Sequence, residues 1–168
     1  MRFNLLKVLL VDDNQHMKTL LGEMLRAIGV RDVHAAADGS EALDLMRRYE
    51  IDIVFTDLNM KPLDGIDFVR QLRTSTDSPN PFAPVIMVTG HSTRARVEAA
   101  RDVGVNEFLA KPITARSVLD RVQRIVERPR AFIRSDGYFG PDRRRREDPG
   151  YTGPKRRRAD MAEIDGPR

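Results

Sequence analysis

One stretch of the chain constrains the fold more than any other: residues 51–65, which read IDIVFTDLNMKPLDG. A run of apolar and β-branched residues ends here in Asp57 and is followed by a turn that contains Pro, Asp and Gly. Short apolar runs bounded by turn residues are typical of buried strands. We therefore expect a buried strand over 51–56 that presents the Asp57 carboxylate on the following loop.

Three other strand-like runs also end in polar side chains. They are residues 7–11 before Asp12 and Asp13, residues 85–88 before Thr89 and Gly90, and residues 107–110 before Lys111 and Pro112. The carboxyl ends of parallel strands that are joined by helices lie along one edge of a sheet, where open α/β sheets build their sites. The sequence therefore predicts a cleft that gathers three carboxylates, a hydroxyl group and an ammonium group.

Segments with helical periodicity separate these strands. Apolar residues at helical spacing, together with Gly and Pro boundaries, predict helices over 17–28, 40–48, 66–73, 93–103 and 115–126, and a short strand over 33–36. The helix over 93–103 has an apolar face made mainly of alanine, so we expect it to be the least firmly held. Five alternations of strand and helix predict an α/β domain with a five-stranded parallel sheet between two layers of helices.

The composition changes after residue 128, where Pro129 closes the predicted domain. Residues 129–168 contain ten Gly or Pro residues and few apolar ones, so we expect a flexible, largely disordered tail without a second core. The net charge of +4 comes entirely from this tail, because Lys and Arg balance Asp and Glu over residues 1–128. The tail also repeats a unit, Tyr-x-Gly-Pro-x-Arg-Arg-Arg, at Tyr138 and Tyr151.

Composition also limits the class of protein. The chain has no cysteine, which rules out disulfides and thiolate metal sites. No run approaches the roughly 18 apolar residues of a membrane span, and the first residues lack the apolar stretch of a signal peptide. We therefore expect a cytoplasmic protein.

The polar residues at the strand ends resemble the receiver domain of bacterial two-component response regulators, in particular the single-domain, chemotaxis-regulator type. The matching residues, in order, are Asp12, Asp13, Asp57, Thr89 with Gly90, Phe108, and Lys111 with Pro112. The match covers residues 6–127, about three quarters of the chain. The resemblance implies a doubly wound, flavodoxin-like (βα)5 fold with strand order 2-1-3-4-5.

A divalent cation is expected at the cleft, because three ionised carboxylates cannot lie close together without one. An all-oxygen site with open water positions suits Mg²⁺. The resemblance implies that Asp13, Asp57 and the backbone carbonyl of Asn59 bind the metal directly, and that Asp12 assists through water.

The resemblance also implies the chemistry. Asp57 is the expected phosphoacceptor, and Lys111 is expected to pair with the phosphoryl oxygens. Thr89 would bond the new phosphoryl group, and its movement would let Phe108 rotate inward as the second switch residue. Such a protein catalyses only its own phosphorylation and dephosphorylation, and it is a signalling protein rather than an enzyme.

The implied partners are a sensor histidine kinase or a histidine phosphotransfer protein, which donates the phosphoryl group, and a downstream target protein. The target would bind the face formed by the helix over 93–103, the strand over 107–110 and the last helix. A role as a shuttle in a phosphorelay is equally compatible with this sequence.

Two alternatives remain. The arginine runs of the tail, 143–146 and 155–158, suggest a regulator that binds nucleic acid under the control of phosphorylation, although a solvated extension accounts for the same residues. A Mg²⁺-dependent phosphatase of the haloacid dehalogenase type is remote, because that chemistry needs a second carboxyl two residues after the nucleophile, where this chain has Asn59.

The loop after Asp57 departs from the family pattern. The family commonly has proline directly after the methionine of this loop, whereas here Met60 is followed by Lys61 and then Pro62. The sequence leaves the path of this loop and the role of Lys61 open.

Overall fold

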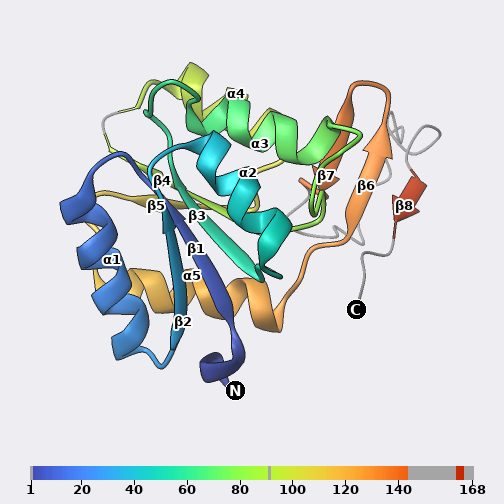
Figure 1. The fold of residues 1–168 in the computed structure, drawn as a ribbon. Helices are drawn as coiled ribbons and strands as arrows, with labels where there is room; N and C mark the ends of the chain where they lie inside the picture. The colour runs from blue at the N-terminus through green and yellow to red at the C-terminus, as the bar shows by residue number, and fades with distance from the viewer. Residues whose placement is uncertain (1, 91, 144–161, 165–168) are drawn as a thin grey trace.

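A five-stranded parallel sheet forms the centre of the molecule, with strand order β2-β1-β3-β4-β5 (Figure 1). The computed structural model describes residues 2–90, 92–143 and 162–164. The strands are β1 (Lys7–Val11), β2 (Asp32–Ala36), β3 (Ile53–Asp57), β4 (Val85–Thr89) and β5 (Glu107–Ala110). The predicted doubly wound, flavodoxin-like fold is confirmed.

Five helices cover the two faces of this sheet (Figure 1). Helices α1 (Gln15–Ala27) and α5 (Ala115–Glu127) pack on one face. Helices α2 (Gly39–Arg48), α3 (Gly65–Thr74) and α4 (Arg94–Asp102) pack on the other, and a short 3₁₀ helix, η1 (Phe3–Leu5), precedes β1. Each α-helix begins after a residue whose side chain accepts a backbone N–H of the first turn: Asn14, Asp38, Asp64, Thr93 and Thr114.

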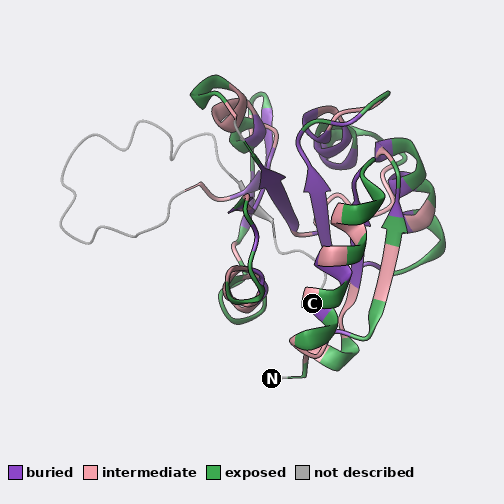
Figure 2. Ribbon diagram, turned by 90° about the vertical axis from the view of Figure 1, so that its left-hand side faces the viewer, coloured by how far each residue is buried: buried purple, intermediate pink, exposed green. Residues whose placement is uncertain are grey.

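The two layers of core follow from the alternation of side chains along each strand. In β1, Val8 and Leu10 face α1 and α5, whereas Leu9 and Val11 face the other three helices. Figure 2 shows the result: the central strands are buried, and exposure is greatest on the outward sides of the helices. Helix α4 contributes one fully buried residue, Ala100, because its inward face is built from alanines.

A second, smaller sheet follows α5, in the segment that the sequence analysis assigned to a disordered tail. Strands β6 (Phe132–Ser135) and β7 (Tyr138–Pro141) form an antiparallel hairpin, and β8 (Ala162–Ile164) pairs with the other edge of β6. The hairpin closes through the two residues Asp136 and Gly137, and Gly137 has φ of +74°, which glycine adopts without strain. In Figure 1 the hairpin lies beside the end of α3.

The expectation of a tail without a core is wrong for residues 129–143. Phe132, Ile133, Tyr138 and Phe139 are buried. The rings of Phe132 and Phe139 both lie 5.3 Å from that of Phe82, which precedes β4, and 5.6 Å from each other. These aromatic contacts bury enough apolar surface to order a short segment whose overall composition is poor in apolar residues. Residues 144–161 and 165–168 lie outside the described part of the chain.

Arg73, at the end of α3, lies beneath the hairpin with an exposure of only 3%. Its guanidinium donates hydrogen bonds to the carbonyl oxygens of Gly104, at 3.0 and 3.1 Å, and Pro81, at 2.8 Å. It also donates to Asn106 Oδ1 at 3.0 Å and lies 5.0 Å from the centroid of the Phe132 ring. Burial lowers the pKa of Arg73 to about 9, so the side chain is still a cation at neutral pH.

The described part of the first copy of the repeated tail unit, residues 138–143, is a compact structural motif. The Tyr138 hydroxyl donates to the Pro141 carbonyl at 2.7 Å, so the ring folds back over the backbone of its own strand. A Cβ at Gly140 would lie 2.7 Å from the Tyr138 hydroxyl and 2.9 Å from Gly104 Cα, which explains why the motif has glycine there. Arg143 stacks on the Tyr138 ring at 4.0 Å. The second copy, at Tyr151, lies outside the described residues.

Candidate functional site

The polar strand ends meet at one edge of the sheet, as the sequence predicts. Strands β1, β3, β4 and β5 are direct neighbours in this order. Their last residues are in register, with Val11 opposite Thr56, Asp57 opposite Val88, and Thr89 opposite Ala110. Asp12 and Asp13 therefore follow β1 beside the end of β3, and Lys111 follows β5 beside the end of β4.

Asp57 lies at the centre of this edge, with an exposure of 8%. One carboxylate oxygen accepts a hydrogen bond from Lys111 Nζ at 3.1 Å, and the other accepts from the backbone N–H of Asn59 at 3.2 Å. Two donors thus fix the direction of the carboxylate. The carboxylate therefore has a defined orientation at the carboxyl end of β3.

The three carboxylates form a cluster that suits a hard cation. Oxygen atoms of Asp12, Asp13 and Asp57 lie within 4.8 Å of one another. Burial, followed by the charges of Asp57 and Asp13, raises the pKa of Asp12 to about 6, even though the backbone N–H of Asn14 bonds its carboxylate at 2.8 Å. The cluster is therefore short of positive charge, and an all-oxygen donor set of this kind fits Mg²⁺.

The two predicted switch residues lie on adjacent strands. Thr89 ends β4 and is 8% exposed, and Phe108 is half-buried in β5, where it is in register with Met87. Phe108 packs against the core on the α4 side of the sheet, and its carbonyl accepts a hydrogen bond from Arg121 Nε of α5 at 2.6 Å. The ring of Phe108 thus lies on the α4 side of the sheet, and its backbone is bonded to α5.

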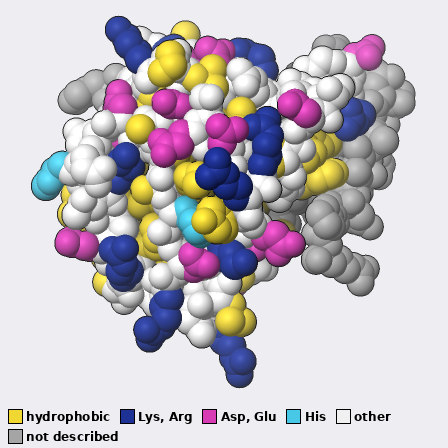
Figure 3. All heavy atoms as spheres, in the orientation of Figure 1, with side chains coloured by type: hydrophobic (Ala, Val, Ile, Leu, Met, Phe, Trp, Pro, Cys, Tyr) yellow, Lys and Arg dark blue, Asp and Glu magenta, His cyan; other side chains and the backbone are white. Residues whose placement is uncertain are grey.

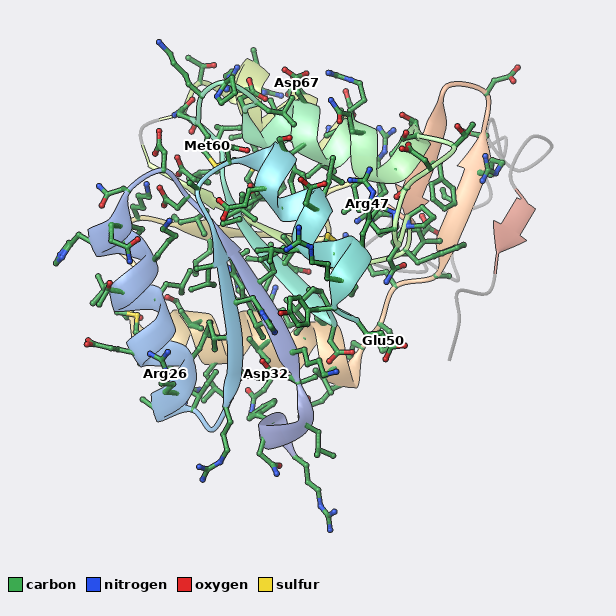
Figure 4. All side chains as sticks on the ribbon, in the orientation of Figure 1. Arg26, Asp32, Arg47, Glu50, Met60 and Asp67 are labelled. Carbon is green, nitrogen blue, oxygen red and sulfur yellow. The ribbon has the colours of Figure 1, made fainter. Side chains whose placement is uncertain are left out.

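The acceptor loop, residues 58–64, takes a tight path. The peptide bonds Lys61–Pro62 and Lys111–Pro112 are both cis. Met60, labelled in Figure 4 on the connection between β3 and α3, is buried, whereas Lys61 is exposed. Gly65 closes the loop: its N–H donates to the Leu58 carbonyl at 3.1 Å, and a Cβ there would lie 2.2 Å from the Asp57 carbonyl oxygen. Only glycine fits at this close approach.

One site residue was missed by the sequence analysis. Arg96 of α4 donates to Asn59 Oδ1 at 3.2 Å and lies 3.5 Å from Asp64 Oδ2, so it connects α4 to both ends of the acceptor loop. No local signal marks this residue, because Arg96 and Asn59 are 37 positions apart in the sequence.

The profile of the response regulator receiver domain family matches residues 8–123 of the chain. The chain belongs to this family. The receiver is 33% identical over 123 residues to chemotaxis protein CheY-3 of Vibrio cholerae. The aligned region covers 73% of this chain and 93% of that protein. It is 34% identical to chemotaxis protein CheY of Pseudomonas aeruginosa over 123 residues, 73% of this chain and 98% of the relative. Receiver domains are signalling proteins that work with histidine kinases or phosphotransfer proteins and with downstream targets.

Solved structures agree with this assignment. CheY4 of Vibrio cholerae superposes on the receiver with a TM-score of 0.65 at 31% identity, over 71% of this chain and 98% of that one. The receiver domain of the sensor histidine kinase PA1611 of Pseudomonas aeruginosa also gives a TM-score of 0.65, at 30% identity, over 73% of this chain and 98% of that one. That structure holds a magnesium ion in its active site cleft.

The surface of the receiver carries charges of both signs. Figure 3 shows Lys and Arg side chains interspersed with Asp and Glu over the face that it presents. Within the described residues, no helix has the length and apolar character needed to cross a membrane. Most of the arginine runs that motivated the nucleic-acid alternative lie outside the described part of the chain.

Proposed function

We propose that this receiver accepts a phosphoryl group on Asp57 from a histidine kinase or a histidine phosphotransfer protein. The observation that carries the proposal is the environment of Asp57: a nearly buried carboxylate held by Lys111 at 3.1 Å and by the Asn59 N–H at 3.2 Å, beside Asp12 and Asp13. A carboxylate fixed in this way is prepared for attack on phosphorus, because its approach direction is set before the donor arrives.

In the transfer step, an Asp57 carboxylate oxygen forms a bond to phosphorus while the phosphorus–nitrogen bond of the donor's phosphohistidine breaks. The electron pair of that bond returns to the imidazole nitrogen. Lys111 then pairs with a phosphoryl oxygen, and Thr89 donates its hydroxyl to another. Hydrolysis by water breaks the oxygen–phosphorus bond again, releases phosphate and restores the carboxylate.

Asp12, Asp13, Asp57 and the carbonyl of Asn59 are the residues that would hold Mg²⁺. When bound, the ion would offset the negative charge that the phosphoryl group adds to the three carboxylates. The receiver's own residues do the rest. Lys111 and Thr89 orient the phosphoryl group, and the burial of Asp57 limits the access of water.

The output of this chemistry is a change in protein contacts. Phosphorylation draws Thr89 towards the acceptor and opens space for the Phe108 ring, which alters the face formed by α4, β5 and α5. We propose that a downstream protein binds this face in a phosphorylation-dependent way.

The test is the intact mass of the receiver after incubation with a small phosphodonor and Mg²⁺, compared with the Asp57→Asn variant. We expect a gain of one phosphoryl group that requires Mg²⁺ and is absent from the variant. A phosphoryl group on Asp57→Asn, or no gain in the wild type under conditions in which a known receiver is modified, would disprove the assignment.

A further inference from the structure

Helix α4 is weakly anchored in the core of the receiver. Ala100 is its one buried residue, and burying a methyl group removes little apolar surface from water. At the amino-terminal end of the helix, Arg96 donates a hydrogen bond to Asn59 Oδ1 at 3.2 Å. At the other end the last residue is Asp102, whose negative charge is unfavourable beside the free carbonyl groups of a helix end. The position of α4 therefore depends on contacts at its two ends.

The segment after α5 supplies a contact at the carboxyl end of α4. We call this segment, residues 130–143, the strap; it consists of the hairpin and the residues that flank it. Arg143 Nη1 of the strap pairs with Asp102 Oδ1 at 2.7 Å, and the Arg143 guanidinium lies 4.0 Å from the centroid of the Tyr138 ring. The ring limits the freedom of the guanidinium, and the guanidinium offsets the charge of Asp102. The strap thus stabilises the carboxyl end of α4.

The turn between α4 and β5 lies against the backbone of the strap. A Cβ at Gly140 would lie 2.9 Å from Gly104 Cα, and a Cβ at Gly104 would lie 3.1 Å from the Phe139 carbonyl oxygen, so the two backbones are in close contact. Arg73 of α3 also donates to the Gly104 carbonyl, at 3.0 and 3.1 Å. The turn is therefore held both by the end of α3 and by the strap.

The strap also bonds the first residue of β5. Arg130 pairs with Glu107 at 3.1 Å, and only 9% of the Glu107 side chain is exposed. The strap itself is fixed through the rings of Phe132 and Phe139, which both lie 5.3 Å from the ring of Phe82. One firmly seated segment therefore connects the last residue of α4 to the first residue of β5.

We propose that the strap holds α4 in the position that it has in the unmodified receiver, so that phosphorylation must work against it. Helix shifts in allosteric proteins are about 1–2 Å, and a shift of that size would break the contact between Arg143 and Asp102 unless the strap moved too. The inference rests on the proposed phosphorylation of Asp57, which supplies the change that moves α4. Weakening the strap makes the shifted position of α4, and with it phosphorylation, more favourable.

The experiment is amide hydrogen exchange of the full-length receiver, with the wild type compared with Arg143→Asp, which replaces the ion pair with Asp102 by a repulsion. The Arg143 side chain is 34% exposed, so the variant keeps the fold. The matched control is Arg26→Asp, which makes the same change of charge in the exposed last turn of α1, where Figure 4 shows Arg26. Intact mass at a series of acetyl phosphate concentrations, with Mg²⁺ present, follows the phosphorylation of each protein.

We expect the amides of residues 99–104 to exchange about fivefold faster in Arg143→Asp than in the wild type, and at an unchanged rate in Arg26→Asp. Half-maximal phosphorylation should require about threefold less acetyl phosphate in Arg143→Asp and the wild-type concentration in Arg26→Asp. Because coupling between two sites is reciprocal, phosphorylation of the wild type should itself accelerate the exchange of these amides.

Equal exchange over residues 99–104 in the wild type and Arg143→Asp would overturn the proposal, because the strap would then not hold α4. So would faster exchange in an Arg143→Asp receiver that needs as much acetyl phosphate as the wild type, because the strap would then stabilise the helix without opposing phosphorylation. Failure of all three proteins to accept a phosphoryl group would instead refute the proposed function, and the exchange comparison would then decide by itself whether the strap restrains α4.

Discussion

Arg96 of α4 donates a hydrogen bond to Asn59 Oδ1 at 3.2 Å, two residues beyond the Asp57 carboxylate. This contact places a guanidinium beside the loop that follows Asp57 and connects that loop to α4. A cation at the entrance of a cleft raises the local concentration of anions and so the rate at which they arrive. If Asp57 accepts a phosphoryl group as proposed, Arg96 is placed to attract the anionic donor.

The first prediction is that Arg96→Ala slows phosphorylation by a small anionic donor about threefold at low salt, with less effect at high salt, because the loss is electrostatic. The measurement is the time course of intact mass. Arg94→Ala is the matched control, since Arg94 is on the same turn of α4 but pairs with Glu98 and has a side chain that is 92% exposed. Equal rates for Arg96→Ala and the wild type would show that the guanidinium does not assist the donor.

The second prediction concerns the pH dependence of stability in the absence of metal. The pKa of Asp12 is raised from 3.8 to about 6, so the charged carboxylate is less stable in the folded receiver than in the unfolded chain. This destabilisation is complete above pH 6 and disappears as the pH falls towards 3.8. Asp12→Asn should therefore raise Tm by roughly 2–4 °C at pH 7.5 and have little effect near pH 4.

The check is thermal unfolding of both proteins across this range in EDTA. Mg²⁺ should reverse the order at pH 7.5, because the wild type gains a stabilising ligand that the variant binds less well. A pH-independent difference between the two proteins would mean that packing, rather than the charge of Asp12, separates them.

Most of the fold and the core of the site could be predicted from local patterns. Strand periodicity located Asp57, and the polar ends of three more runs located Asp12, Thr89 and Lys111, because parallel topology brings strand ends together. The strand boundaries differ from the predicted ones: β3 spans Ile53–Asp57, whereas the apolar run begins at Ile51. The start of the strand cannot be placed from apolar residues alone, because such residues are buried just before a strand as well as within it.

The hairpin was missed, although its signal is present in the sequence. Asp136 and Gly137 separate two runs with aromatic and β-branched residues, and Asp-Gly between such runs is a strong indication of a hairpin. The Gly and Pro content of the whole tail outweighed this local signal. The hydrogen-bond partners of Arg73 and Arg96 could not be predicted from the sequence. They lie 31 and 37 positions away along the chain and become neighbours only when the chain folds.

The third prediction tests the acceptor loop. Gly65→Ala places a methyl group where the Asp57 carbonyl oxygen is 2.2 Å away, so the start of α3 or the end of β3 must shift. We expect a loss of about 3 kcal/mol in the free energy of unfolding. Gly90→Ala is the control for stability, because its Cβ would meet only Lys111 Cδ at 3.6 Å, an ordinary contact. The measurement is urea unfolding, and a similar small change in both variants would contradict the close approach.

The last prediction concerns the buried cation beneath the hairpin. Replacing a buried charge by an apolar side chain can stabilise a protein when the charge is poorly satisfied, but Arg73 donates to three acceptors and stacks on Phe132. Arg73→Met would leave the buried Gly104 carbonyl without its side-chain donor, and a buried unsatisfied acceptor is costly. Asn106 Oδ1 would keep the Val85 N–H at 2.9 Å. We therefore expect Arg73→Met to lower the free energy of unfolding by about 3 kcal/mol, measured in urea. Arg70→Met, on the exposed side of the same helix, should change the free energy of unfolding by less than about 0.5 kcal/mol.

The hairpin should also loosen in Arg73→Met, with faster amide exchange over residues 132–141, because the Phe132 ring loses the cation against which it packs. A variant as stable as the wild type, with unchanged exchange in the hairpin, would show that the α4–β5 turn and the hairpin are held without Arg73.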